Sequence, residues 1–452
     1  MNAHYDELTL QEYLDDPESF EGRAVLETHL ALCRTCSLLL EELRAFEATL
    51  SRETKWELAS AAVHDQNPPP EIRALAELLA GEDLDAAVML SPLLGSPASF
   101  RRANITAMPL MRTAGIVRRL CRESRALRER QPMHALVVAD AAIALADQLS
   151  HARYPQTLLD ELRGDAWLER ANVLRYLGRH EEALDAADIA ARAFAQSPVA
   201  AYSTALVNYL RGVIYVELER LPEALRFVRR AARVFREFGE EERFVHAKIV
   251  EATVLFDQNR VREARDLFLS LVRIAKNIGE APTLARLYNN VANCQLRLHE
   301  LESAEVYYAR ALSLYEALGL ETERIRTRWN IGCLRIATGD LGDGLARLRE
   351  ARREFEQLGL RSDAALVTLD IAEALLATGE AAAAREAAEL CSAILESFAS
   401  VGMTGHALTA LAFLREAFAT GSATPSLVRH VRHYLETRPD QTGVPFLPPS
   451  HL

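Results

Sequence analysis

Four residues near the amino terminus have the types and the spacing of a metal site. His29, Cys33 and Cys36 form an H-x3-C-x2-C run, and His4 lies upstream of them. On a helix, residues four apart point to the same side, so His29 and Cys33 converge, and Cys36 follows in the turn that starts the next helix. Two imidazoles and two thiolates form a tetrahedral set that suits zinc. The pattern predicts a His2Cys2 zinc site in a small helical domain over residues 1–65.

This segment resembles the zinc-binding anti-sigma factor domain, whose signature is H-x3-C-x2-C preceded by a more distant His or Cys. The flanks agree, because residues 10–16 stand where the family has its first short helix and residues 38–43 continue the helix after the second cysteine. The resemblance covers residues 4–60. It implies that the domain binds a sigma factor of the extracytoplasmic-function class by wedging between its two helical halves. The alternative is a zinc-free helical domain in which Cys33 and Cys36 are core residues.

Cysteine usage indicates a reducing compartment. Six cysteines in 452 residues are too few for a disulfide scaffold. We expect the four isolated ones to be buried small hydrophobic residues: Cys121, Cys294, Cys333 and Cys391. No run of 18 apolar residues occurs, and the first residues lack the features of a signal peptide, so we expect a cytoplasmic protein without a membrane partner. Oxidation of Cys33 and Cys36 would eject zinc, but thiol sensing requires activated thiolates.

Composition favours an all-α fold. The chain has 20 glycines and 17 prolines, fewer than is usual, while 49% of its residues are hydrophobic and 7% aromatic. The net charge is −12, and residues 1–60 hold 13 acidic against 5 basic residues. This balance argues against direct nucleic-acid binding, which needs clustered Lys and Arg. The acidic end either complements a basic partner surface or is an ordinary solvated face.

Small residues recur at a fixed interval through most of the chain. They stand at positions 183, 224, 264, 304, 344 and 384, and another small residue lies twelve positions before each one. Small side chains at fixed points on two successive helices let the backbones approach closely. The register predicts six antiparallel helix pairs of about 40 residues over 161–403.

The repeats resemble the tetratricopeptide repeat, through Gly212-x-x-Tyr215 in a first helix and Ala264-x-x-x-Phe268 in a second. The usual period of that family is about 34 residues, so both helices here are expected to be longer. The resemblance implies a right-handed α-solenoid. Residues 66–160 are expected to form degenerate repeats, with helices over 71–94 and 133–147. Residues 404–452 are expected to form capping helices, at 405–419 and 425–436, and a Pro-rich tail.

A solenoid of this family lines its concave face with the first helix of each pair. The inward-facing positions and their neighbours predict a partner-binding groove formed by Asn172, Tyr209, His246, Thr253, Arg286, Asn289, Asn293, Arg297, Arg326 and Trp329. Guanidinium groups and carboxamides can hold a peptide backbone or carboxylates, and Trp329 offers a flat anchor. The alternative is that these are ordinary solvated residues.

No enzyme motif stands out: the chain has no glycine-rich phosphate loop, no G-x-S-x-G and no H-E-x-x-H. The first functional hypothesis is therefore a non-enzymatic cytosolic regulator. Its zinc domain binds a protein, in particular a sigma factor, and its repeats sense or recruit a peptide or protein. The second hypothesis is a scaffold that assembles a multiprotein complex through its repeats, with a purely structural zinc module.

Overall fold

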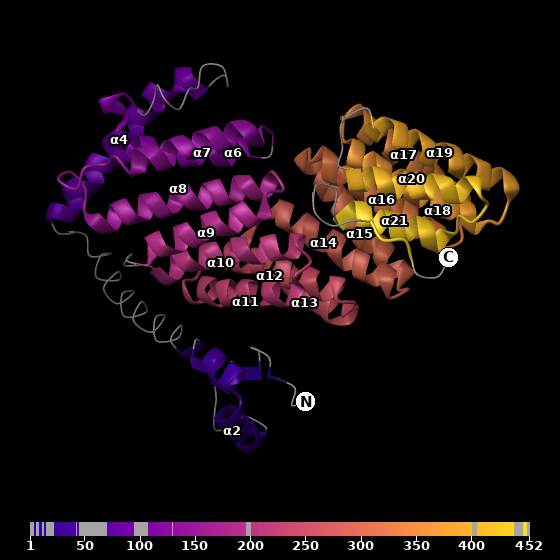
Figure 1. Cartoon of the computed structure of the whole chain (residues 1–452), viewed down its shortest axis with the longest axis horizontal. Coiled ribbons are helices and arrows are strands. Elements are labelled where there is room, and N and C mark those ends of the chain that lie inside the picture. Colours follow the sequence, from indigo (N-terminus) through magenta and orange to yellow (C-terminus); the bar gives the residue numbers. More distant parts are fainter. Residues whose placement is uncertain are drawn as a thin grey trace. The chain divides into compact units, whose positions relative to one another are not determined.

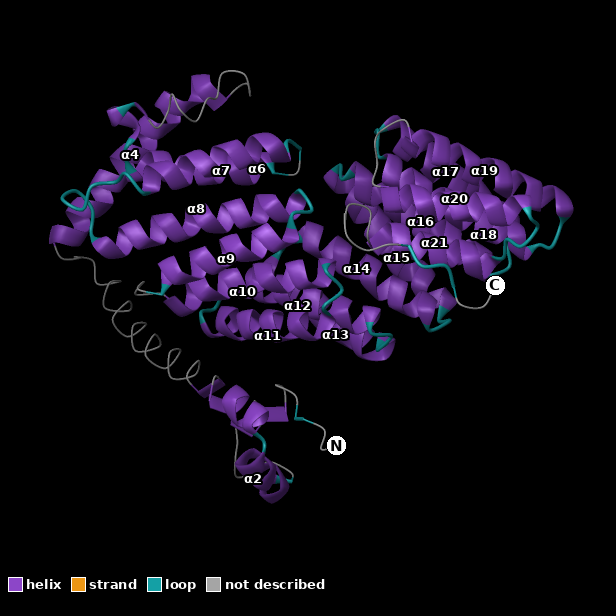
Figure 2. Ribbon diagram, in the orientation of Figure 1, coloured by secondary structure: helices purple, strands orange, loops and turns teal. Residues whose placement is uncertain are grey.

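A computed structural model of the chain describes residues 4–5, 9–10, 13–14, 22–41, 43–44, 70–94, 107–128, 130–195, 200–399, 405–437 and 446–449 (Figure 1). Every regular element within these ranges is a helix (Figure 2), which confirms the predicted all-α class. The chain divides into two compact units. Unit 1 comprises residues 1–215 and 222–240, and unit 2 comprises residues 216–221 and 241–452. The sequence had predicted no division inside the repeat array.

The amino-terminal part of unit 1 is a small helical module with its own core. Helix α2 (Arg23–Leu32) begins after Gly22, whose φ of 86° is left-handed, and it ends where Cys33 becomes extended. Helical residues 34–41 follow. The buried side chains are Leu10, Tyr13, Leu26, Cys36, Leu40 and Leu43. The predicted boundary at residue 65 lies outside the described residues.

The rest of unit 1 is a stack of helices. They are α4 (Pro70–Leu94), the 3-10 turn η1 (Pro109–Met111), α6 (Ala114–Leu127), α7 (Pro132–Ala146), α8 (Gln156–Tyr176), α9 (His180–Phe194), α10 (Ala200–Glu217) and α11 (Leu221–Glu237). Helix α4 packs on α6, α6 on α7, α7 on α8 and α8 on α9. Helices α4 and α7 coincide with the segments 71–94 and 133–147 that the sequence marked as helical.

Unit 2 continues the same alternation. Its helices are α12 (Glu241–Asp257), α13 (Val261–Ile278), α14 (Ala281–Arg297), α15 (Leu301–Leu318), α16 (Glu321–Ala337), α17 (Leu341–Gln357), α18 (Arg361–Ala377), α19 (Ala381–Ala399), α20 (Gly405–Ala419) and α21 (Pro425–Thr437). Each helix packs on the next, and the first helices of successive pairs touch, α12 with α14, α14 with α16 and α16 with α18. The first helices of successive pairs therefore lie side by side within unit 2.

Small residues set the distance between the two helices of a pair. A Cβ added to Gly212 would lie 2.4 Å from the Val228 side chain, and one added to Gly344 would lie 3.0 Å from the carbonyl oxygen of Gly332. Most of the alanines at the predicted register are fully buried, whereas Ala384 is half-buried. The predicted close crossings of paired helices are therefore present.

The turns inside the pairs use a left-handed residue at a constant position. Glycines take this position in three repeats, Gly178, Gly339 and Gly379. The other three repeats use Glu219, Asn259 and His299, whose φ angles are 56°, 61° and 59°. A left-handed conformation is unfavourable for a residue with a Cβ, less so for asparagine and histidine. Glu219 therefore carries the most local strain of the three, and His299 carries less.

The far end of unit 2 is closed by α20 and α21, in the segments where the sequence predicted capping helices. Helix α21 also packs on α18, and Phe446 of the tail is buried against Phe413 and Tyr434. Tail residues 438–445 and 450–452 lie outside the described residues. None of the helices in the described part of the chain combines the length and apolarity that crossing a bilayer would need.

Candidate metal centre and partner-binding faces

The four predicted metal ligands come together in the amino-terminal module. One ligand atom from each of His4, His29, Cys33 and Cys36 lies within 4.8 Å of the other three. The end of α2 explains this geometry, because Cys33 terminates the helix on the same side as His29 and the chain turns directly into the helix that holds Cys36. His4 is the long-range member and reaches the cluster from the chain terminus.

The separations between these atoms fit a tetrahedral ion. The Nδ1 of His4 lies 3.2 Å from the Sγ of Cys33 and 3.7 Å from the Sγ of Cys36, and the Nε2 of His29 lies 3.3 Å from the Sγ of Cys36. Zn–N and Zn–S bonds of about 2.1 and 2.3 Å give tetrahedron edges of about 3.4–3.8 Å. The three N–S separations are close to these edges, and a small contraction of the cluster, whose ligand atoms all lie within 4.8 Å of one another, would hold a four-coordinate zinc ion.

Neighbouring groups fix the orientation of the cluster. The ring of Tyr5 packs edge-on against the ring of His29 at a centroid distance of 4.9 Å.

The backbone N–H of Cys36 donates to the Cys33 sulfur. Together with the nearby Cys36 and histidine side chains, it lowers the pKa of Cys33 to about 6. Burial raises the pKa of Cys36. One thiol of the pair is therefore already disposed to ionise as a metal ligand must.

The isolated cysteines behave differently. Cys121, Cys294 and Cys391 are buried and Cys333 is half-buried, as predicted for small hydrophobic residues. Burial raises the pKa of Cys294 and of Cys391 to about 12 and that of Cys121 and Cys333 well above the ordinary value. Only the pair at the metal cluster has a thiol with a lowered pKa among the described cysteines.

Helix α2 exposes a second, apolar face beside this cluster. Leu26 and His29 face the module, while the opposite side carries Ala24, Val25, Thr28, Ala31 and Leu32, all exposed. Val25 is 67% and Leu32 84% exposed, and the Thr28 hydroxyl donates to the carbonyl of Ala24. A helix that is apolar on both sides is normally covered on both. The sequence analysis did not identify this face.

In unit 2, three asparagines on α14 and α16 form a hydrogen-bonded cluster. The Nδ2 of Asn330 donates to the Oδ1 of Asn289 at 3.2 Å and to the Oδ1 of Asn293 at 3.3 Å. The hydroxyl of Tyr308 also donates to Asn293, at 2.7 Å. Because both oxygens are held inside the protein, the amide nitrogens of Asn289 and Asn293 remain as donors that form no hydrogen bond within the described residues.

Three predicted residues occupy one repeat position on α12, α14 and α16. The Nε2 of His246 lies 3.1 Å from the Thr283 hydroxyl, and Arg326 forms a 2.9 Å ion pair with Asp363. Arg286, between them, is exposed and has neither an ion pair nor a hydrogen bond to any described residue. With Asn289 and Asn293 on the same side of α14, it forms a row of donors.

The prediction that Trp329 is an exposed anchor in the partner-binding groove is wrong. Trp329 is only 9% exposed, its ring packs edge-on against Phe355, and its indole N–H donates to Asp370 at 2.6 Å. Asp370 also pairs with Arg432 of α21. Trp329 therefore belongs to the core, because the next repeat supplies a buried carboxylate that satisfies its N–H.

The remaining predicted residues contribute locally. Arg297 donates to Asn259 at 3.1 Å and lies over the ring of Phe256, and the Thr253 hydroxyl donates to the carbonyl of Ile249. Asn172 and Tyr209 are half-buried residues of unit 1, so they belong to a different unit from the α14 row. Sequence reasoning missed Asn330, although it carries the same carboxamide chemistry and stands one repeat after Asn290.

The comparisons with known proteins bear on the repeats. A tetratricopeptide repeat family model matches residues 251–317, which lie within α12 to α15, so unit 2 contains repeats of this type. The chain is similar to the apo form of RapI, at 16% identity over 60% of this chain and 96% of that one, with a TM-score of 0.46. It is also similar to a Rap protein complexed with competence and sporulation factor. The identity is 13% over 72% of this chain and 100% of that one, and the TM-score is 0.46. A third similar structure is that of aspartyl phosphate phosphatase F from Bacillus subtilis. The identity is 12% over 78% of this chain and 97% of that one, and the TM-score is 0.46. The comparison with curated proteins gave no match.

Proposed function

We propose that the chain is a non-enzymatic regulatory protein. Its amino-terminal module holds a structural zinc ion and docks a partner protein, specifically a sigma factor of the extracytoplasmic-function class, and its repeats bind a peptide or protein segment. The observation that carries this proposal is the joint presence of a four-residue ligand cluster and an uncovered apolar face on α2.

Zinc supplies stability in this proposal. His4, His29, Cys33 and Cys36 would fill all four positions of the ion, and a catalytic zinc would need one left open. Among its described residues, the module has a core of six buried side chains. A core of that size needs an additional cross-link to stay folded, and a metal that ties residue 4 to residues 29–36 provides one.

The partner of the module is expected to be apolar and basic. Val25 and Leu32 are seven residues apart, which is two helical turns, so they lie on the same side of α2 and form an anchor for an apolar helix. The acidic excess of residues 1–60 favours encounter with a basic surface. The resemblance to the anti-sigma factor domain supplies the specific candidate.

The repeat array is proposed to bind through α14. Arg286, Asn289 and Asn293 present donors at intervals of three or four residues, along about 10 Å of one helix side. Donors without acceptors suit carboxylates and backbone carbonyl groups of a bound chain. Asn330 keeps the two carboxamides in this orientation.

The sigma-factor proposal is tested with the full chain. Sigma factors from the same genome are produced one at a time and titrated with the wild type, with Val25→Glu plus Leu32→Glu, and with Val306→Glu. Val306 is an exposed apolar residue of α15 and serves as the matched control. We expect one sigma factor to bind the wild type and the control equally and the double variant at least tenfold more weakly. If none binds while zinc is retained, the scaffold hypothesis replaces this proposal.

The array is tested separately with peptides selected on the full chain from a displayed random library. The double variant Asn289→Ala plus Asn293→Ala should bind a selected peptide about tenfold more weakly, which corresponds to about 1.4 kcal/mol of binding free energy. Arg262→Ala, at an exposed arginine of α13, is the control. Equal affinity of both variants would place the binding face elsewhere.

A further inference from the structure

Helix α4, the first described helix of the stack in unit 1, has an apolar outer face. Leu75, Leu78, Leu79, Ala86 and Leu90 are buried or half-buried on the side toward α6. The other side exposes Ala76, Ala80, Gly81, Leu84, Ala87 and Val88, together with the polar residues Arg73, Glu77, Asp85 and Ser91. Leu84 is 73% and Val88 76% exposed. The end helix of a repeat stack needs a polar outer face, whereas the middle of this face carries a run of exposed apolar residues.

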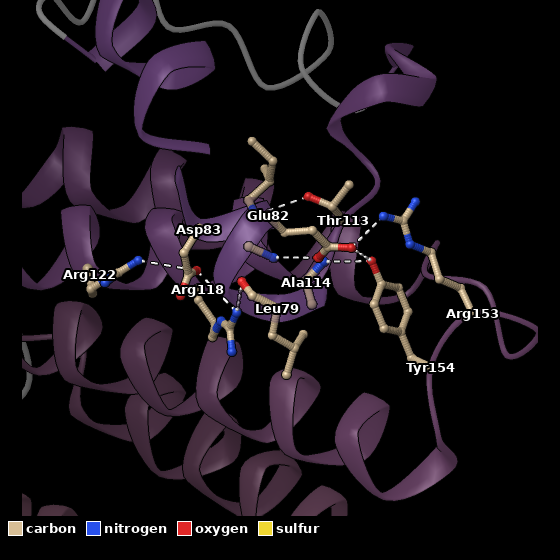
Figure 3. A network of polar contacts seen from close by, with 11 residues as sticks. Leu79, Glu82, Asp83, Thr113, Ala114, Arg118, Arg122, Arg153 and Tyr154 are labelled. Carbon is tan, nitrogen blue, oxygen red and sulfur yellow. Dashed lines mark hydrogen bonds and ion pairs between the residues drawn. The ribbon is translucent and has the colours of Figure 1, made fainter. Parts of the chain in front are cut away.

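Polar contacts hold α4 firmly against α6, so this face belongs to a fixed helix (Figure 3). The carboxylate of Glu82 is 5% exposed and accepts hydrogen bonds from the backbone N–H of Gly115 at 3.1 Å, from the Tyr154 hydroxyl at 2.7 Å and from Arg153 at 2.5 Å. The carbonyl of Glu82 would be only 2.3 Å from a Cβ on Gly115, so the two backbones touch. The outer face is therefore presented in one defined orientation.

The last helix of unit 2 is built differently. Helix α21 exposes Ser426, Arg429, His430 and His433, all of them polar. A polar end is what a monomeric stack requires for solubility. The exposed apolar residues of α4 thus have no counterpart on helix α21.

The side chains on this face are arranged symmetrically by size. Ala76 and Ala80 lie six and two residues before Glu82, and Val88 and Leu84 lie six and two residues after it. If two such helices pack antiparallel about the level of Glu82, every large side chain meets a small one, Leu84 against Ala80 and Val88 against Ala76. Small residues facing large ones interdigitate without voids.

Gly81 provides an independent observation for close approach at the centre of this face. It lies in the middle of a 25-residue helix, where glycine costs about 1 kcal/mol relative to alanine. A Cβ at Gly81 would meet no atom within 4 Å, so packing inside the described chain does not require this glycine. A second backbone crossing next to the level of Glu82 would require it.

We propose that the outer face of α4 binds the same face of a second copy of this chain, in an antiparallel helix pair centred on residue 82. In this register Glu77 meets the level of residue 87, so the exposed carboxylates of the two copies do not face each other. One helix per copy buries less than the ~1,200 Å² at the low end of standard interfaces. The dimer is therefore reversible, and it joins two metal-binding modules in one particle.

Sedimentation velocity of the zinc-loaded full chain over a micromolar concentration series tests the proposal. The wild type should shift from monomer to dimer, and Leu84→Glu plus Val88→Glu should stay monomeric with unchanged circular dichroism. Ile72→Glu is the matched control, because Ile72 is 48% exposed on the same helix but outside the symmetric set. A monomeric wild type at every concentration would overturn the proposal and leave the face to another protein or to residues 45–69 or 95–106. Equal dimerisation of the wild type and the double variant would also overturn it.

Exchange of sizes tests the register. Ala80→Leu alone should weaken the dimer at least tenfold by overpacking, and Leu84→Ala alone should weaken it by leaving a gap. The double variant Ala80→Leu plus Leu84→Ala should recover most of the affinity, because each large side chain again meets a small one. Additive losses in the double variant would contradict the antiparallel register.

Discussion

Replacement of Glu82 is the change whose consequence can be worked out most fully from the structure. Glu82→Gln keeps the size of the side chain but removes the negative charge that pairs with Arg153. The new amide NH2 group then points at groups that are themselves hydrogen-bond donors. Three hydrogen bonds end on this carboxylate, from the Gly115 N–H, the Tyr154 hydroxyl and the Arg153 guanidinium. Hydrogen bonds to a charged group contribute about 1.5–3 kcal/mol each, and the glutamine keeps part of this network. We expect a loss of about 2 kcal/mol in the stability of the contact between α4 and α6.

Hydrogen exchange measured by peptide mass is the suitable assay, because opening of α4 is a local event in a chain with two units. A loss of 2 kcal/mol corresponds to about thirtyfold faster exchange in α4. Peptides of α16 to α18 in unit 2 should exchange as in the wild type.

Asp85→Asn is the matched control for Glu82→Gln. Asp85 is an exposed acidic residue of the same helix and has neither a hydrogen bond nor an ion pair to any described residue. Its replacement removes the same charge from α4 and should change exchange less than about twofold. If both variants accelerate exchange equally, net charge and not the buried network holds α4, and the reasoning is refuted.

Three further predictions concern the repeats. His299→Gly should raise the melting temperature by about 1–2 °C, because glycine removes the left-handed strain at a φ of 59°. Gly344→Ala should destabilise unit 2 by about 1–3 kcal/mol in urea unfolding, because the added Cβ would lie 2.5 Å from the Ile336 side chain, whereas Gly342→Ala should not, because its Cβ would meet only the Asp340 carboxylate, at an ordinary contact distance of 3.9 Å. Burial and nearby arginines lower the pKa of His246 from its ordinary 6.5, so the unfolded chain takes up this proton first and stability falls as pH drops through 6.5. His246→Gln should remove that component from the dependence of melting temperature on pH, and an identical profile in the variant would contradict it.

The repeats were the most predictable part of the fold. A small residue every 40 positions is a direct consequence of helix crossing, so it located the paired helices. The turn residues were less predictable, because His299 and Glu219 adopt a conformation that glycine takes in other repeats. Local sequence does not reveal that strain, since packing of the flanking helices imposes it.

The candidate sites divide in the same way. The ligand cluster was predictable because helical spacing fixes His29, Cys33 and Cys36 relative to one another. The burial of Trp329 was not, because it depends on Asp370, which lies 41 residues further along the chain in the next repeat. The Glu82 network joins residues up to 72 positions apart and has no local pattern at all. Long-range polar contacts were thus the component that only the structure could provide.

Metal analysis of the purified full chain tests the central claim most directly. The account predicts one equivalent of zinc per chain in the wild type. It predicts no zinc in Cys33→Ser plus Cys36→Ser, with unchanged helical content in the repeats. A wild-type chain that binds no zinc after reconstitution, or a double variant that still holds one equivalent, would contradict the assignment of this cluster as a metal centre.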